Sequence, residues 1–98
     1  MRTLLHEDFI EHNPGNPSGR DAFVEHVTDA PVASAGLDLK RVIADGQYVV
    51  MHYLMTRPGE ERGTAVVDIW RLRDGLIVEH RDVVQPVPDP AEIPHGMF

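Results

Sequence analysis

The sequence contains no cysteine among its 98 residues. Disulfide scaffolds, cysteine nucleophiles and cysteine-ligated zinc sites are therefore excluded. Basic residues are also scarce, because nine Lys and Arg stand against sixteen Asp and Glu, which gives a net charge of −7 with histidine neutral. Proteins that bind nucleic acid need clustered Lys and Arg side chains, and this chain has no such cluster. We therefore expect no nucleic-acid partner.

Long hydrophobic runs are absent as well. No apolar segment approaches the roughly 20 residues that a membrane-spanning helix needs, and no basic start followed by an apolar core suggests a signal peptide. We expect no membrane partner and a cytoplasmic location. The hydrophobic fraction of 42% is ordinary for a globular protein, and it suffices for one small domain over residues 1–98.

The first third of the chain has patterns typical of helices. Leu5 and Phe9 are spaced i, i+4, and the proline after His12-Asn13 disfavours helix in the residue before it, so a first helix is expected to end there. A second helix is predicted from about residue 19 to 29, with Ser18 as its cap and Pro31 at its end. The chain starts within a few residues of its first helical signal, which is compatible with truncation at the N-terminus.

The rest of the chain is typical of β-structure. Four runs rich in β-branched residues predict strands at about residues 37–44, 47–56, 64–72 and 76–84. Asp45-Gly46 and Asp74-Gly75 lie between such runs, where Asp-Gly is a strong hairpin signal. We therefore predict an α+β fold, with N-terminal helices covering a curved, antiparallel, four-stranded meander. Residues 86–98 form a Pro-rich tail.

His80 and Asp82 are the most informative residues of the last predicted strand. Alternate side chains share one face of a strand, so both point the same way within an apolar stripe. Because buried polar groups cost free energy unless they are paired, this pattern indicates a cavity suited to proton transfer. A carboxylate in an apolar pocket is a better base, since desolvation disfavours the anion, and Asp82 is therefore the candidate catalytic acid/base. The alternative is a structural carboxylate paired with Arg41 or Arg71.

The turn at Asp74-Gly75 allows two strand registers. A two-residue loop places Asp68 opposite Arg81, whereas a three-residue loop with glycine in the bulge position places Asp68 opposite His80. We favour the second register, because it leaves one face apolar around two polar pairs. The residues on that concave face are then Asp68, Trp70, His80 and Asp82.

His80 and Asp68 each have a structural alternative to a direct role. His80 either orients a substrate oxygen or is a core histidine satisfied by Asp68, and Asp68 either contacts substrate or holds the imidazole tautomer. His80-x-Asp82 also supplies two of the three ligands of a facial metal triad. No spacing specifies a third ligand, so we expect no metal.

Other residues are predicted to bind substrate around this site. His12 and Asn13 are expected to cap the pocket and bind a carbonyl, although Asn13 could simply end the first helix. His52, in the second strand, would line the pocket if the sheet curls around the helices. Trp70 is expected to be more a core residue than a stacking platform, although it lies on the concave face.

Five motifs together resemble the SnoaL-like polyketide cyclase family, which belongs to the nuclear-transport-factor-two-like superfamily. Their order and spacing carry the resemblance, over about residues 7 to 88. The motifs are Phe9-Ile10-Glu11-His12-Asn13-Pro14, Arg41-Val42-Ile43-Ala44-Asp45-Gly46, Ala65-Val66-Val67-Asp68-Ile69-Trp70-Arg71, Asp74-Gly75-Leu76-Ile77-Val78-Glu79-His80 and Gln85-Pro86-Val87-Pro88.

The resemblance implies a cone-shaped α+β barrel with a deep pocket, and a homodimer formed through the convex face of the sheet. It also implies an enzyme without a cofactor that performs aldol cyclisation, isomerisation or dehydration on a hydrophobic carbonyl compound. The family's acid on the last strand aligns with Asp82, or with Gln85 if the alignment shifts by three. The alternative function is a non-catalytic module for ligand binding or dimerisation. The convex face of the last two predicted strands suits a symmetric contact, with Val67, Ile69, Ile77 and Val83.

Overall fold

The structure is a computed structural model that describes residues 2–29 and 34–98. Its elements, in chain order, are η1 (Arg2–Leu4), β1 (Leu5–Glu11), α1 (Arg20–Asp29), β2 (Gly36–Asp45), β3 (Tyr48–Thr56), β4 (Thr64–Arg73), β5 (Leu76–Pro86) and η3 (Pro90–Glu92). No helix within these ranges is long and apolar enough to cross a membrane. The predicted α+β class is confirmed.

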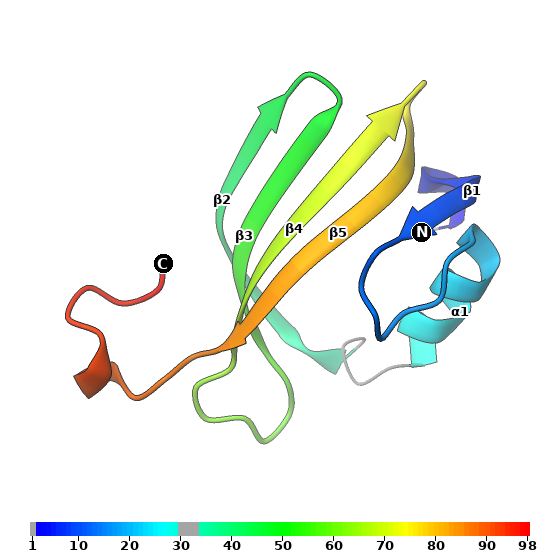
Figure 1. The fold of residues 1–98 in the computed structure, drawn as a ribbon. Helices are drawn as coiled ribbons and strands as arrows, with labels where there is room; N and C mark the ends of the chain where they lie inside the picture. The colour runs from blue at the N-terminus through cyan, green and yellow to red at the C-terminus, as the bar shows by residue number, and fades with distance from the viewer. Residues whose placement is uncertain (1, 30–33) are drawn as a thin grey trace.

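The strands form one curved, mixed sheet in the order β1-β5-β4-β3-β2. Strands β2 to β5 pair antiparallel in sequence order, and β1 adds to β5 in parallel. The sheet stays open rather than closing into a barrel, with α1 beside β1 at one end (Figure 1). The prediction of four strands covered by several helices is therefore wrong, because the described residues form five strands and one α-helix.

The predicted first helix is the strand β1. Leu5, Phe9 and Glu11 are buried along it. An i, i+4 spacing puts two side chains on the same face of a helix and also of a strand, so the spacing of Leu5 and Phe9 fits both. The segment forms a strand because it pairs with β5, which lies some 70 residues further along the chain. The local sequence gives no sign of that pairing.

Helix α1 covers the β1 end of the sheet. Phe23 is 5% exposed, and its ring lies 4.8 Å from that of Phe9. The predicted cap role of Ser18 is wrong, because its hydroxyl accepts from the backbone N–H of Glu11 and donates to the Glu11 carbonyl. Ser18 thus holds the end of β1 rather than the start of α1. Pro31 lies outside the described residues.

A bulge in β5 decides which side chains face inward. Asp74 and Gly75 both have positive φ, as a two-residue type I′ turn requires, so the favoured three-residue loop is wrong. The register then shifts, because Leu72 pairs with Ile77 but Arg71 pairs with Glu79. Beyond this bulge Asp68 lies opposite Asp82.

The bulge preserves the predicted concave face by a different route. An extra residue turns the following side chains over, which offsets the shift caused by the shorter loop. Trp70 therefore lies opposite His80, and Asp68, His80 and Asp82 share one face as predicted. The bulge also turns Ile77 inward against the core of Leu5, Phe9 and Phe23, so its predicted place on the convex face is wrong.

Gly63, just before β4, provides a test of the backbone geometry. A Cβ on Gly63 would lie 2.7 Å from the carbonyl oxygen of Met55, whereas one on Gly59 would meet nothing within 4 Å, and both residues have positive φ. We expect Gly59→Ala to cost about 1 kcal/mol through backbone strain alone. Gly63→Ala should cost about 3 kcal/mol, because it adds a clash with the backbone. Urea unfolding measures both, and equal losses would contradict this packing.

Candidate functional site

The concave side of the sheet and helix α1 border a cavity of about 800 Å³. Most of its lining side chains are apolar and come from η1, α1 and all five strands. Its polar residues include Asn13, Tyr53, Asp68, His80 and Asp82. The polar residues of the predicted concave face, Asp68, His80 and Asp82, line this cavity together with Trp70.

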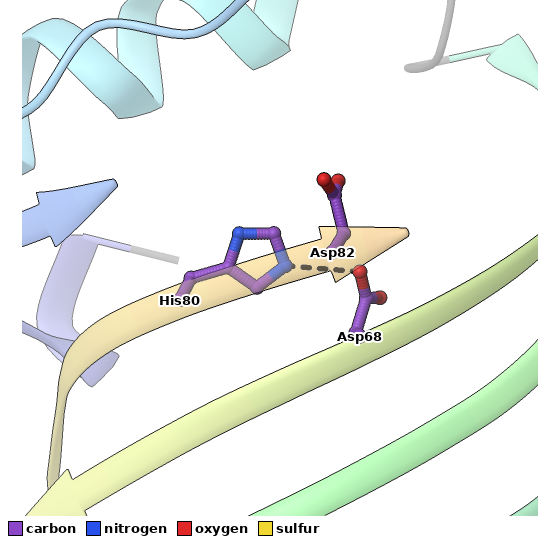
Figure 2. A group of neighbouring side chains, drawn as sticks. All are labelled: Asp68, His80 and Asp82. Atoms are coloured by element: carbon purple, nitrogen blue, oxygen red, sulfur yellow. Dashed lines mark hydrogen bonds and ion pairs between the residues drawn. The ribbon is translucent and has the colours of Figure 1, made fainter. Parts of the chain in front are cut away.

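His80 lies between two carboxylates in the wall of the cavity. Its Nε2 is 2.9 Å from Oδ1 of Asp68, and its Nδ1 is 2.8 Å and 3.0 Å from the two carboxylate oxygens of Glu11. Figure 2 shows the imidazole pointing along β5 toward Asp68 on the neighbouring strand, with Asp82 above them. The imidazole is only 4% exposed and the Glu11 side chain is fully buried.

These contacts keep the imidazole charged. Burial alone would lower the pKa of His80, but hydrogen bonds to Asp68 and Glu11 and the negative charges of both raise it to about 9. Burial would raise the pKa of Glu11, and its bonds to His80, to the Asn13 backbone and to Asn16 lower it instead. The site therefore contains a buried imidazolium with a carboxylate on each side.

Glu11 also organises the loop that follows β1. Its Oε1 accepts the backbone N–H groups of His12 and Asn13, and its Oε2 accepts the side-chain amide of Asn16. Together with the contacts to His80, these bonds give each oxygen of the buried carboxylate at least two hydrogen-bond partners. The same residue thus holds the imidazole of His80 and the loop that carries Asn13.

Asp82 lies partly exposed at the cavity surface, held by Asn13. The Asn13 amide nitrogen lies 2.8 Å and 2.9 Å from the two oxygens of Asp82, and its own oxygen accepts the backbone N–H of Gly15. The predicted alternative, a pairing of Asp82 with Arg41 or Arg71, is not what the structure has: Arg41 contacts His52, and Arg71 bonds Glu79.

Aromatic rings complete the polar end of the cavity. The Trp70 ring stacks on the His80 ring with centroids 4.0 Å apart, an arrangement that favours a cationic imidazole. Burial, the charge of Asp68 and a hydrogen bond to Asp68 raise the pKa of the Tyr53 phenol, with a smaller contribution from Asp82. The phenol therefore stays protonated and can donate a hydrogen bond.

Two predicted binding residues lie away from the cavity. His12 is 41% exposed, and its Nε2 lies 2.7 Å from Glu79 in a surface cluster with Arg71 and Arg81. His52 contacts Arg41 and stacks on the ring of Phe98. On β3 the cavity is lined by the alternate residues Met51, Tyr53 and Met55, so the side chain of His52 points to the other face.

The sequence reasoning missed Glu11 and Tyr53. Glu11 was predicted to lie in a helix, and a helix does not predict its contact with His80. As a strand residue it shares the inner face with Leu5 and Phe9. Tyr53 alternates with Met51 and Met55 on β3, but no tight turn joins β3 to β4, so the register between these two strands could not be predicted. The alternation of side chains between the two faces of a strand is the signal that would have found both residues.

One group among the described residues has the composition of a metal site. Ligand atoms of Asp68, His80 and Asp82 all lie within 4.8 Å of one another. However, Nε2 of His80 is already hydrogen-bonded to Asp68, and a metal ligand needs that nitrogen free of its proton. The arrangement suits proton transfer between a carboxylate and its polar neighbours better than metal binding.

The raised pKa of His80 makes stability depend on pH. An unfolded histidine titrates near 6.5 and the folded one near 9, so the stabilisation is complete below about 6.5 and disappears as the pH rises through 9. We expect the free energy of unfolding, measured in urea, to fall across this interval. His80→Gln should remove most of that slope, whereas His95→Gln, at an exposed position, should keep it. An unchanged slope in His80→Gln would contradict the assignment.

Glu11 offers a second test. Glu11→Gln keeps the shape but leaves a buried imidazolium with one charged partner fewer, so it should cost about 3 kcal/mol. Glu7→Gln, an exposed change on the same strand, should cost less than about 0.5 kcal/mol. Urea unfolding near neutral pH compares the two, and a loss in Glu11→Gln as small as that in Glu7→Gln would show that the buried charge is not needed.

Comparison with solved structures shows the fold. An NTF-2 like protein of unknown function from Burkholderia xenovorans LB400 has a TM-score of 0.77 at 20% identity, covering 99% of this chain and 77% of that chain. A putative ketosteroid isomerase from Kribbella flavida DSM 17836 has a TM-score of 0.74 at 22% identity, covering 94% and 71%. A steroid delta-isomerase from Pseudomonas aeruginosa has a TM-score of 0.70 at 25% identity, covering 87% and 65%.

Comparison of sequences gives the family. No curated protein matches the chain, but the SnoaL-like domain matches residues 1–80. That match contains Glu11, Asp68 and His80, and it ends within β5 before Asp82. The chain therefore belongs to the SnoaL-like domain family and has the α+β fold of nuclear-transport-factor-two-like proteins.

Proposed function

We propose that this protein is a small enzyme that performs general acid/base chemistry, without a cofactor, on a hydrophobic carbonyl compound. The reaction class is enolisation followed by aldol cyclisation, isomerisation or dehydration. One observation carries the proposal: the carboxylate of Asp82 stands at a mostly apolar cavity beside a buried imidazolium. Removal of a proton next to a carbonyl requires a base in apolar surroundings. It also requires a fixed positive charge near the enolate that forms.

Asp82 is the proposed general base. It takes a proton from the carbon beside the carbonyl and later returns it to another carbon or to a leaving oxygen. The positive charge of His80 offsets the negative charge that develops on the enolate. Asn13, Asp68 and Trp70 are the proposed neighbours of the substrate. His12 and His52, which lie outside the cavity, have no part in this scheme.

Similar structures support the reaction class. Two of them bear the names ketosteroid isomerase and steroid delta-isomerase, and isomerisation is one of the three reactions proposed. The likeness in sequence is between 22% and 25%, so the substrate of those proteins is not transferred to this one. A cytoplasmic location is part of the same proposal.

The second candidate function is a ligand-binding or dimerisation module with no turnover. The observation in its favour is the exposure of apolar side chains on the face of the sheet that is turned away from the cavity. Ile43 of β2 is 58% exposed there, and Val83 of β5 is 67% exposed. Such surfaces suit contact with a second copy of the chain, and a homodimer is proposed on this ground.

Replacing Asp82 by Asn tests the base directly. The wild-type protein should catalyse exchange of the protons beside the carbonyl of an apolar ketone such as 2-tetralone in deuterated water, followed by NMR. Asp82→Asn keeps the shape and removes the base, so the exchange rate should fall by about a hundredfold or more. Asp45→Asn removes the same charge at an exposed site outside the cavity and should leave the rate unchanged.

Two outcomes would contradict the proposed chemistry. Exchange that persists in Asp82→Asn would assign the base to another residue. Ketone binding by the wild-type protein with no exchange above that of buffer would favour the binding module.

A further inference from the structure

The polar end of the cavity has its hydrogen-bond donors already in use. The amide of Asn13 donates to Asp82, and both nitrogens of His80 lie against carboxylates. The phenol of Tyr53 bonds Asp68. Carboxylate oxygens, by contrast, each accept more than one hydrogen bond. The capacity that remains for a ligand is therefore mainly that of an acceptor.

Negative charges also outnumber positive charges at this end of the cavity. Glu11, Asp68 and Asp82 contribute three carboxylates, and His80 supplies at most one positive charge in return. Arg57, another cation that lines the cavity, is paired with Glu60. Carboxylates with too few cations in an apolar setting favour a ligand that brings positive charge with it.

The cavity around these acids has the size and lining for an organic molecule. Its volume of about 800 Å³ lies within the range typical of sites for small molecules. Aromatic side chains of Phe23, Tyr53 and Trp70 line it near the acids. Aromatic faces attract organic cations, and apolar walls attract the hydrocarbon part of the same ligand.

We propose that the cavity binds an apolar molecule that carries a protonated amine, with the ammonium group held by Asp82 and Asp68. An organic ammonium ion suits this place better than a metal ion. The ammonium donates to carboxylate oxygens and leaves the bond between His80 and Asp68 intact, whereas a metal would have to displace the proton from Nε2 of His80.

The inference also specifies the substrate class of the proposed function. That substrate class rests on the proposed function, whereas the binding of an amine does not. Proton transfer to Asp82 moves one negative charge from that carboxylate to the enolate, which then lies near the carboxylates of Asp68 and Glu11. A positive charge on the substrate would stabilise this enolate through space. The substrate class is then an amine-bearing carbonyl compound rather than any hydrophobic ketone.

Binding of three matched probes tests the inference without any turnover. The probes are 3-phenylpropylamine, 3-phenylpropan-1-ol and 3-phenylpropionate, which share one hydrocarbon body and carry a cation, a neutral donor and an anion. Trp70 is the single tryptophan of the chain and lines the cavity, so its fluorescence reports occupancy. The amine should bind about tenfold more tightly than the alcohol, and the carboxylate more weakly than either.

Two variants with the same change of charge separate the site from general attraction. Asp82→Asn should weaken binding of the amine by about tenfold and change that of the alcohol by less than about twofold. Asp45→Asn lies outside the cavity and should alter neither. If Asp82→Asn does not fold, the comparison of the three probes on the wild-type protein still decides.

Several results would overturn the inference. These are equal affinity for the amine and the alcohol, a preference for the carboxylate, or equal losses in Asp45→Asn and Asp82→Asn. A change in Trp70 fluorescence with Zn²⁺ alone that displaces the amine and requires Asp82 would show a metal site instead. Because none of the probes has a ketone, amine binding without proton exchange would support this inference while contradicting the proposed chemistry.

Discussion

The hydrogen bonds that His80 makes with Glu11 and Asp68 are the constraint on which the rest of this structure depends. They join β1, β5 and β4 through side chains that are almost fully buried. Breaking one of them would leave a buried charge without a partner, which is far less favourable than never forming the pair. The parallel edge strand β1 is therefore tied to the sheet by charge as well as by backbone pairing.

The same constraint places the candidate base. The carboxylate of Glu11 accepts the backbone N–H of Asn13 and so holds the loop. The side chain of Asn13 in turn holds Asp82 at the cavity surface. Glu11 thus contributes, with Asp68, to the protonation of the imidazole and also helps to position a carboxylate that it does not touch. This explains how a chain with few cations can keep several acids together, because each acid is neutralised or bonded in a fixed place.

The alternation of side chains along each strand could be predicted from the sequence, whereas pairing between distant segments could not. The common face of Asp68, His80 and Asp82 follows from alternation along strands, and it survived an error in the turn because the bulge at Val78 compensated for the shorter loop. Glu11 was missed because an i, i+4 spacing of Leu5 and Phe9 fits helix and strand alike. The open sheet, with β1 added in parallel, depends on contacts some 70 residues apart, which no local pattern contains.

The most direct test of this account is the protonation state of His80 in the folded protein. Long-range ¹⁵N–¹H NMR of protein labelled at histidine distinguishes an imidazolium, with a proton on each nitrogen, from a neutral ring with one. We predict that near neutral pH both Nδ1 and Nε2 of His80 are protonated. A neutral ring with a single protonated nitrogen at that pH would contradict the central claim, because Glu11 and Asp68 would then face a group without charge.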